Sequence, residues 1–227
     1  MQIAIILAAG KSRRLKGINK IFYKIKGKPL IFYTISIFEK HPQIKKIVLV
    51  AQKTNFKKFF SLIKKYRFKK ISKVVKGGRK RQDSAFSGLK AVETLGAKSG
   101  DLILFHNGAN PLVSQKEISE VIKAAKKYRA ALVGQPAKDT MKEVNKRGLI
   151  TKTIDRKKIY LAQTPQVIEY KLAKEVFKKA FKDKFYGTDD VSLVERLGKK
   201  VKIVPCSSRN IKITYPEDLK FVRSQLK

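Results

Sequence analysis

Short apolar runs alternate along the whole chain with longer stretches whose apolar residues recur at helical spacing, and this alternation constrains the fold most strongly. Continuous apolar character over about four to eight residues is typical of strands that are buried on both faces. Strands separated in this way by helices predict an α/β fold with a doubly wound, mostly parallel sheet. The runs that we interpret as strands are 2–7, 46–51, 71–75, 101–105 and 130–135.

The spacing of apolar residues also identifies individual helices between these strands. Ile118, Val121, Ile122 and Ala125 lie three or four positions apart, which places them on one helix face. A second pattern of this kind closes the chain, and Pro216 suits the first position of that last helix. Both helices therefore have a face that can cover a sheet.

Residues 138–156 depart from this rhythm, because polar and apolar residues alternate there around a turn at 145–148. Such a segment predicts a β-hairpin that projects from the sheet. A two-stranded ribbon is marginally stable by itself, so we expect this arm to pack on a second subunit. The sequence contains no internal repeat and no linker, so we predict one domain over 1–227 with the arm at 138–156 as its embellishment.

The charge of the chain is extreme, with 54 Lys and Arg against 17 Asp and Glu. These lysines are scattered over predicted helix faces, which favours a solvated basic surface over a specific nucleic-acid interface. An RNA-binding protein remains the alternative outside catalysis. The apolar runs are too short to span a bilayer, and the single cysteine, Cys206, excludes an intrachain disulfide. We therefore expect no membrane partner and a cytoplasmic location.

The loop after the first strand, "LAAGKSRRLKGINK" at 7–20, has the composition of a phosphate site. Small residues let the backbone approach a phosphate closely, and N–H groups turned inward bind anions. Arg13, Arg14 and Lys20 add positive charge. The loop matches neither the dinucleotide-binding pattern nor the Walker A pattern, so these two functions lose their main support.

Several segments together resemble a known family. The first loop resembles the signature of nucleotidyltransferases that activate sugar or polyol phosphates, a signature shared with molybdopterin nucleotidyltransferases. The segment "GGRKRQDSAFSGL" at 77–89 is similar to one found in 2-C-methyl-D-erythritol 4-phosphate cytidylyltransferases. The resemblance covers nearly the whole chain, and the further segments that follow in that family's order are "DTMK" (139–142), "TIDR" (153–156), "QTPQ" (163–166), "TDD" (188–190) and "NIKITYPEDL" (210–219).

The resemblance implies a Rossmann-like nucleotidyltransferase fold and a reaction of isoprenoid precursor biosynthesis. A polyol phosphate oxygen attacks the α-phosphorus of CTP, and pyrophosphate leaves. Because both reactants are anionic, the protein mainly positions them and neutralises charge. The resemblance assigns Arg14 and Lys20 to the triphosphate and Lys212 to the α-phosphate. We expect Mg²⁺ carried mainly by the CTP phosphates and assign no metal ligand to the protein, although related nucleotidyltransferases use an acidic residue at the end of the strand 101–105 to help hold the ion.

The resemblance also assigns binding residues for both substrates and a homodimer. The neighbouring subunit's arm contributes part of the acceptor site in this family. For Ser84, a second role as a helix cap is equally open. Asp189 and Asp190 suit the positive end of a following helix. The nucleotide-binding set is Ala8, Ala9, Gly10, Gly78, Arg79, Ser84 and Gly108, and the acceptor-binding set is Asn107, Asn110, Thr140, Arg156 and Thr164.

The loop at 106–111 departs from the family's pattern. That pattern reads H-D-A-A-R-P, whereas this chain has H-N-G-A-N-P, with Asn107 and Asn110 in place of the aspartate and the arginine. An amide keeps the shape of a carboxylate and adds a donor, but it removes the charge. The acceptor is then 2-C-methyl-D-erythritol 4-phosphate, ribitol 5-phosphate or another polyol phosphate, or the activity is impaired. The retained basic residues argue against impairment, although Ser12 also replaces the second glycine of the first loop.

Overall fold

A computed structural model of the chain describes residues 1–15 and 19–226, apart from the side chain of Arg13. The side-chain charge expected at Arg13 therefore lies outside the described residues. The main feature is a seven-stranded sheet with the order β11-β7-β10-β6-β1-β4-β5. Its strands are β1 (Gln2–Ala8), β4 (Ile44–Ala51), β5 (Ile71–Lys76), β6 (Leu102–Asn107), β7 (Ala130–Pro136), β10 (Tyr160–Glu169) and β11 (Lys202–Pro205).

The sheet is parallel except at one strand. Strand β10 lies between β6 and β7 and runs antiparallel to both of them, while the other pairs in the sheet are parallel. The doubly wound, mostly parallel sheet predicted from the sequence is confirmed. Four of the five predicted strand segments lie within strands of this sheet, and the fifth, 101–105, overlaps β6, which begins at Leu102.

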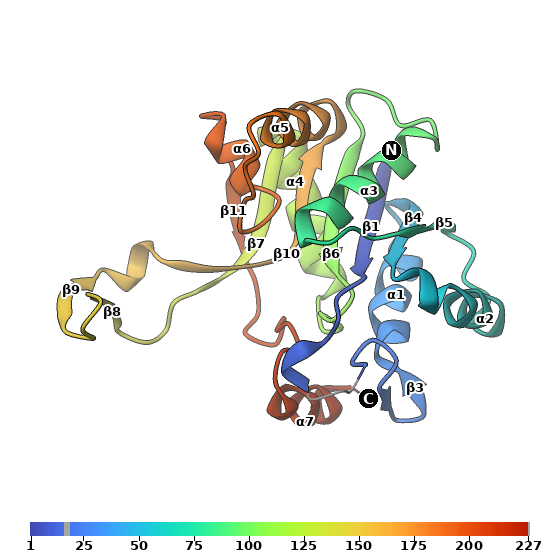
Figure 1. Cartoon of the computed structure of the whole chain (residues 1–227), viewed down its shortest axis with the longest axis horizontal. Helices are drawn as coiled ribbons and strands as arrows, with labels where there is room; N and C mark the ends of the chain where they lie inside the picture. Colours follow the sequence, from blue (N-terminus) through green and yellow to red (C-terminus); the bar gives the residue numbers. More distant parts are fainter. Residues whose placement is uncertain (16–18, 227) are drawn as a thin grey trace.

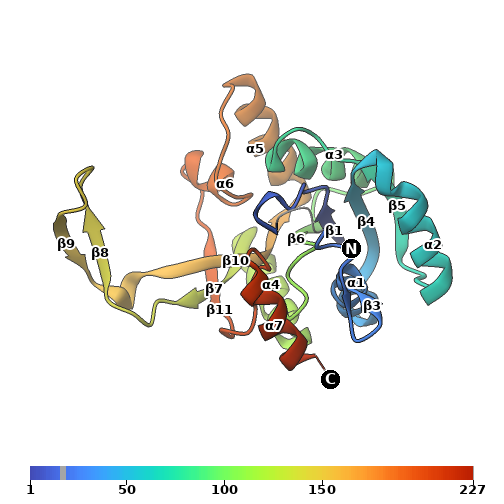
Figure 2. The same ribbon diagram turned by 60° about the horizontal axis from the view of Figure 1, so that its bottom comes forward.

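Helices cover both faces of the sheet, as Figures 1 and 2 show. Because side chains alternate along a strand, β1 contributes Ala4 and Ile6 to one core and Ile3 and Ile5 to the other. The first core is closed by α1 (Leu30–Lys40), α2 (Phe56–Tyr66), α4 (Gln115–Tyr128) and α7 (Pro216–Gln225). The second is closed by α3 (Arg81–Glu93), α5 (Tyr170–Lys182) and α6 (Ser192–Arg196).

Two hairpins stand outside the main sheet. The smaller pairs β2 (Lys24–Ile25) with β3 (Lys28–Pro29). The larger pairs β8 (Met141–Val144) with β9 (Ile150–Ile154) and projects far from the body of the molecule in Figure 1. Its turn is shaped by Asn145, whose Oδ1 accepts hydrogen bonds from the backbone N–H groups of Arg147 and Leu149. The short 3-10 helices are Arg13–Leu15, Lys53–Asn55 and Arg156–Lys158.

The topology places a crevice beside β1. The chain leaves β1 for β4 and β5 on one side and then returns to β6 on the other side. In open α/β sheets, ligands bind at such a reversal, outside the carboxyl ends of the strands. The loops after β1, β5 and β6 all lie at that edge. Within residues 1–15 and 19–226, no helix is long and apolar enough to cross a bilayer.

Candidate functional site

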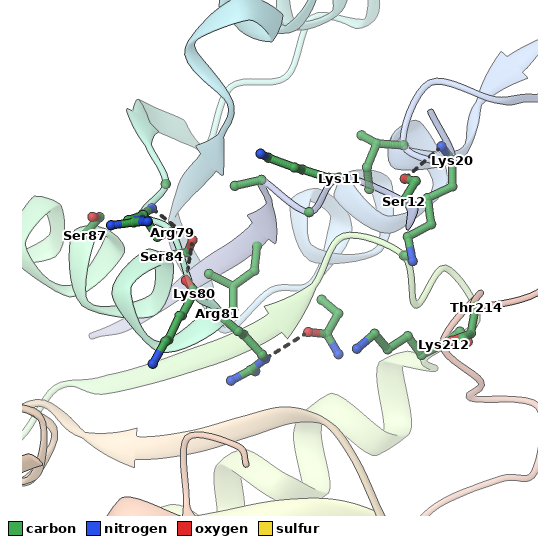
Figure 3. A pocket seen from close by; sticks show the side chains of 18 of the residues that line it. Lys11, Ser12, Lys20, Arg79, Lys80, Arg81, Ser84, Ser87, Lys212 and Thr214 are labelled. Atoms are coloured by element: carbon green, nitrogen blue, oxygen red, sulfur yellow. Dashed lines mark hydrogen bonds between the residues drawn. The ribbon is translucent and has the colours of Figure 1, made fainter. Parts of the chain in front are cut away.

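A cleft of about 1010 Å³ opens at this edge of the sheet, and Figure 3 shows its lining. One wall comes from the loop after β1, and a second comes from the β5–α3 turn at residues 76–81. Asn107 and Ala109 contribute from the end of β6, and Lys212 and Thr214 contribute from the segment before α7. Four segments that are distant in sequence thus share one cavity.

The described lining of this cleft is basic and contains no carboxylate. A concave site lined by one sign of charge concentrates ligands of the opposite sign. The arrangement therefore suits a ligand with several negative charges, such as a polyphosphate. The basic residues in the lining are Lys11, Arg14, Lys20, Lys76, Arg79, Lys80, Arg81 and Lys212.

Lys20 is fixed in the cleft by the backbone around it. Its Nζ donates a 2.8 Å hydrogen bond to the carbonyl of Ile213, and its own N–H donates to Ser12 Oγ at 3.3 Å. Burial, together with the charges of Lys212 and Arg14, lowers the pKa of Lys20 to about 8. Crowded cations of this kind are relieved when an anion binds between them.

Lys212 faces the same space from the segment that precedes α7. That segment is tied to the β6 loop because the N–H of Ile213 donates to the carbonyl of Ala109 at 2.9 Å. Partial burial and the charges of Arg81 and Arg14 lower the pKa of Lys212. Arg14 completes the group, and its guanidinium lies 5.5 Å from the centre of the Tyr215 ring.

Ser12 has a conformation that explains why the family pattern has glycine at this position. Its φ is 51°, in the left-handed region that glycine enters without strain and other residues enter at a cost of about 1 kcal/mol. The hydroxyl compensates by accepting the hydrogen bond from the Lys20 N–H. The loop thus keeps its turn without the second glycine.

The β5–α3 turn packs tightly against the first loop. A Cβ on Gly77 would lie 2.4 Å from Ala9 Cβ, and one on Gly78 would lie 2.2 Å from Asp83 Cβ. Ser84 Oγ accepts from the Gly78 N–H at 3.1 Å and donates to the Lys80 carbonyl. Helix α3 begins at Arg81, so Ser84 lies within its first turn and is not the N-cap residue, which is Lys80. Asp83 accepts the Lys80 N–H.

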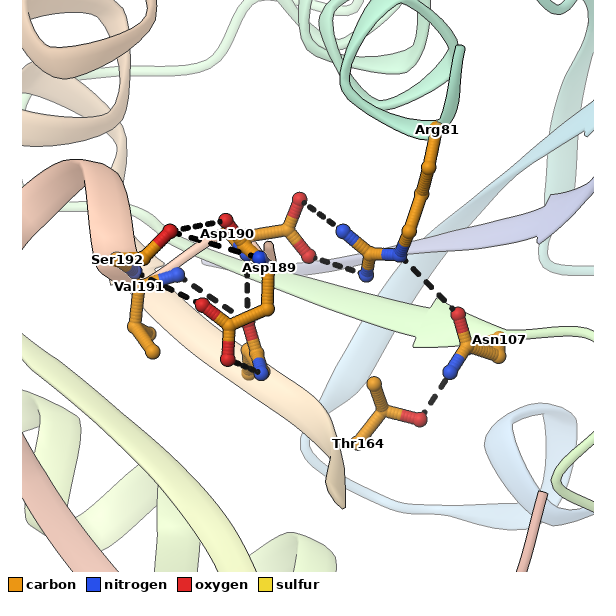
Figure 4. A network of polar contacts seen from close by, with 8 residues as sticks. Arg81, Asn107, Thr164, Asp189, Asp190, Val191 and Ser192 are labelled. Atoms are coloured by element: carbon orange, nitrogen blue, oxygen red, sulfur yellow. Dashed lines mark hydrogen bonds and ion pairs between the residues drawn. The ribbon is translucent and has the colours of Figure 1, made fainter. Parts of the chain in front are cut away.

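Arg81 is the centre of the polar network in Figure 4. Its Nη1 and Nη2 donate to the two oxygens of Asp190 at 2.8 and 2.6 Å, and its Nε donates to Asn107 Oδ1 at 3.4 Å. The Asn107 N–H donates to Thr164 Oγ1 at 3.3 Å. Helix-end electrostatics explain only Asp189, which accepts the Ser192 N–H at the start of α6, whereas Asp190 is a buried ion-pair partner.

The structure brings most of the predicted site residues to the cleft. Ala8 and Gly108 lie directly behind it, where the Gly108 N–H donates to the carbonyl of Leu7. Thr164 contacts the site through Asn107. The predicted residues that line the cleft are Ala9, Gly10, Arg14, Lys20, Gly78, Arg79, Ser84, Asn107 and Lys212.

Besides Thr164, three predicted acceptor-binding residues do not line the cleft of the single chain. Asn110 is fully buried, and its Nδ2 donates to Gln163 Oε1 at 3.4 Å. Thr140 and Arg156 are exposed at the base of the β8–β9 hairpin, and Arg156 Nη1 donates to the Lys138 carbonyl. Sequence reasoning missed Lys11, Lys76 and Lys80. Lys76 directly follows the predicted strand 71–75, and this position at the carboxyl end of a strand could have identified it as a site residue.

The described residues that line the cleft include no His, Cys, Asp or Glu side chain. No group of three or more His, Cys, Asp or Glu side chains suited to a metal occurs in the described parts of the chain. Asn107 offers the cleft a carboxamide in place of a carboxylate, and its oxygen already accepts from Arg81. Mg²⁺ is commonly held by one or two protein oxygens together with waters and phosphate oxygens.

Comparison with known proteins gives a consistent result. A family model described as 2-C-methyl-D-erythritol 4-phosphate cytidylyltransferase matches residues 2–227. A protein of that name from Syntrophus aciditrophicus is 43% identical, over 99% of this chain and 95% of its own length. The crystal structure of 4-diphosphocytidyl-2C-methyl-D-erythritol synthase from Anaerococcus prevotii is similar with a TM-score of 0.86 and 30% identity, over 99% and 95% of the two chains. The Francisella tularensis cytidylyltransferase structure gives a TM-score of 0.82 and 30% identity, over 99% of each chain.

Proposed function

This chain belongs to the 2-C-methyl-D-erythritol 4-phosphate cytidylyltransferase family, and from that premise we infer how its cleft performs the reaction. The activity is the transfer of a cytidylyl group from CTP to 2-C-methyl-D-erythritol 4-phosphate, with release of pyrophosphate. The observation that carries the assignment to this cleft is the convergence of Arg14, Lys20 and Lys212 on a cavity whose described lining has no carboxylate.

The first loop and the β5–α3 turn hold the nucleotide in this proposal. The backbone at Ala9 and Gly10 lies against the phosphates, because small residues leave room for them. The base and ribose occupy the side of the cleft at Gly78, Arg79 and Ser84. The substitution-intolerant packing of Gly77 and Gly78 supports this role, since it keeps the two loops at a fixed separation.

The chemical step requires charge neutralisation more than proton transfer. The phosphate of the acceptor is largely ionised near neutral pH, so its oxygen attacks the α-phosphorus without a general base. Negative charge then develops on the α-phosphate and on the departing pyrophosphate. Lys20 and Lys212 stabilise the former, and Arg14 stabilises the latter. The buried His106, with its pKa lowered to about 4, stays neutral and is not needed for the step.

The acceptor is bound by Asn107, Thr140, Arg156 and Thr164 in this proposal. Asn110 is fully buried and supports this site from behind without contacting the acceptor. Thr140 and Arg156 flank the base of the β8–β9 hairpin, which projects away from the body, so in this proposal they reach an acceptor only in the cleft of a second subunit. The arm's exposed apolar residues support a homodimer, since Leu149 and Ile150 keep 60% and 64% of their surface exposed. Arg156 suits a phosphate because its planar guanidinium can bind two oxygens at once.

The cation that accompanies CTP is Mg²⁺ in this proposal and belongs to the substrate. It lowers the negative charge of the triphosphate, and the chain's own cations neutralise what remains. A cytoplasmic location stays a prediction from cysteine content. The other polyol phosphates, ribitol 5-phosphate first among them, remain alternatives as acceptors because Asn107 and Asn110 differ from the family pattern.

Pyrophosphate release tests this proposal and its alternatives together. The purified protein is given CTP and Mg²⁺ with 2-C-methyl-D-erythritol 4-phosphate, with ribitol 5-phosphate or with molybdopterin, side by side. We expect release with the first acceptor to exceed the other two. Dominant release with ribitol phosphate would reassign the acceptor. Release with none, alongside RNA binding that persists at moderate salt, would favour the non-enzymatic alternative.

A further inference from the structure

The ion pair between Arg81 and Asp190 uses one N–H of each terminal nitrogen, and the Nε–H of the guanidinium faces a third partner. Asp190 is 1% exposed, and both of its oxygens accept from Arg81, so the plane and position of the guanidinium are fixed. The donor Nε–H then faces Asn107 Oδ1 at 3.4 Å. Asp190 is itself held, because its N–H donates to Gln166 Oε1 at 2.8 Å. Figure 4 shows this network, of which Arg81 and Asn107 line the cleft.

The chemistry of the guanidinium dictates which way the amide of Asn107 points. An arginine side chain has five donors and no acceptor, so only the oxygen of a carboxamide can face it. In the opposite orientation, Nδ2 of Asn107 would face Nε–H of Arg81, so two donors would meet at a half-buried position. Both would lose a hydrogen bond, which costs free energy. With Oδ1 turned to Arg81, Nδ2 is the polar atom that Asn107 leaves for the cleft. It donates to no atom within the described parts of the chain.

We propose that Arg81, held by Asp190, is a positioning residue that fixes the carboxamide of Asn107 so that Nδ2 donates a hydrogen bond to a hydroxyl of a bound substrate. This inference rests on the proposed function, in which Asn107 lies beside the reactants. A hydroxyl can both accept and donate, whereas a carboxylate at the same place could only accept. This chain has Asn107 where the family pattern has aspartate. The difference therefore reverses the direction of one hydrogen bond to the substrate, while the class of substrate stays the same.

Substrates with fluorine in place of one hydroxyl test the direction of this bond. Fluorine is a weak hydrogen-bond acceptor and cannot donate. It is therefore tolerated better opposite the Nδ2 donor of Asn107 than opposite the carboxylate of Asn107→Asp. For the contacted hydroxyl, the preference for hydroxyl over fluorine in kcat/KM should be about tenfold larger in Asn107→Asp than in the native protein. A preference that is equal in both proteins for every hydroxyl tested would overturn the proposal.

Two series of analogues identify the source of the hydroxyl. One series replaces single hydroxyls of the acceptor, 2-C-methyl-D-erythritol 4-phosphate, and the other replaces the ribose hydroxyls of CTP. A difference confined to the acceptor series assigns Asn107 to the polyol, and one confined to the nucleotide series assigns it to the ribose. Either result supports the reversed bond. The carboxylate of Asn107→Asp gains Arg81 as a partner, so this variant is expected to fold.

A double-mutant cycle tests whether Arg81 acts through Asn107. Arg81→Lys keeps the charge but loses the Nε donor, and it should raise the KM of the contacted substrate about tenfold with a smaller change in kcat. The same exchange in an Asn107→Ala background should change that KM less than about twofold. Equal effects in both backgrounds would show that Arg81 acts independently of Asn107 and would contradict the proposal.

The control for Arg81→Lys is Arg129→Lys. Arg129 forms a comparable ion pair with Glu169 through Nε and Nη2, but at an exposed place outside the cleft. It should leave both KM values unchanged. Failure of the proposed function is distinguishable, because the native protein would then release no pyrophosphate with the unmodified substrates. If Arg81→Lys fails to fold, the fluorine series on Asn107→Asp still tests the direction of the hydrogen bond that the proposal predicts.

Discussion

Lys20 Nζ donates a 2.8 Å hydrogen bond to the carbonyl of Ile213, 193 residues further along the chain. This bond brings Lys20 beside Lys212, the neighbour of Ile213, although the two lysines repel each other. The backbone therefore holds two cations together before any ligand is present. Such preorganisation places positive charge where a phosphate will sit, without rearrangement at the moment of reaction.

The lowered pKa of Lys20 predicts how CTP binding depends on pH. With a pKa of about 8, the free protein loses the positive charge of Lys20 as pH rises through that value. A bound triphosphate favours the charged form and raises the pKa again. We therefore expect CTP affinity to fall above about pH 8 and binding at pH 8.5 to take up protons. Calorimetry in two buffers of different ionisation enthalpy measures the proton uptake.

Lys20→Arg is the control for this pH dependence, because arginine stays charged over the whole range. The variant should bind CTP without proton uptake at pH 8.5. Equal uptake in the native protein and in Lys20→Arg would assign the titration to another group.

The second prediction concerns Gly77, whose close packing sets the separation of the loop after β1 and the β5–α3 turn. In Gly77→Ala the new methyl group would meet Ala9 Cβ at 2.4 Å and Ser84 Oγ at 2.9 Å. We expect a loss of about 1–3 kcal/mol in the free energy of unfolding and weaker CTP binding. Gly100→Ala is the matched control, because no atom lies within 4 Å of its added Cβ. Denaturant unfolding and calorimetry follow the two effects, and a native-like Gly77→Ala would argue against tight loop packing.

The arm predicts complementation between subunits. Arg156→Ala and Lys212→Ala should each be inactive, since one removes a residue of the arm and the other a residue of the cleft. If each cleft uses the partner's arm, a mixed dimer has one intact site. Coexpression of equal amounts should then restore about a quarter of native activity. No recovery in a purified mixed dimer would place Arg156 in the cleft of its own subunit or outside catalysis.

Most of the fold could be predicted because the spacing of apolar residues along a short segment indicates which of its faces is buried. The continuous apolar run 2–7 and the spacing of Ile118, Val121 and Ile122 each determine one element without distant information. The hairpin could be predicted from the turn at 145–148. Strand β10 could not, because Pro165 within it argues against a central strand, and its place between β6 and β7 depends on tertiary pairing.

The site divides in the same way. Basic residues at the ends of strands could be predicted, since parallel strands bring their carboxyl ends to one edge. The pairing of Arg81 with Asp190 could not, because 109 residues separate them and no local pattern links the two. For the same reason Asp190 was assigned to a helix end. Asn107 was identified only as a departure from a family pattern, and its orientation required the position of Arg81.

Equilibrium binding of CTP to the native protein and to Lys20→Met/Lys212→Met tests the central claim most directly. Methionine keeps much of the length of lysine, so the exchange removes charge with little change in packing. Calorimetry at pH 7 should give one CTP per chain for the native protein and at least about a hundredfold weaker binding for the variant, with both proteins unfolding at similar denaturant concentrations. Equal binding by the two proteins, or no binding by the native one, would contradict the claim that these cations hold the triphosphate.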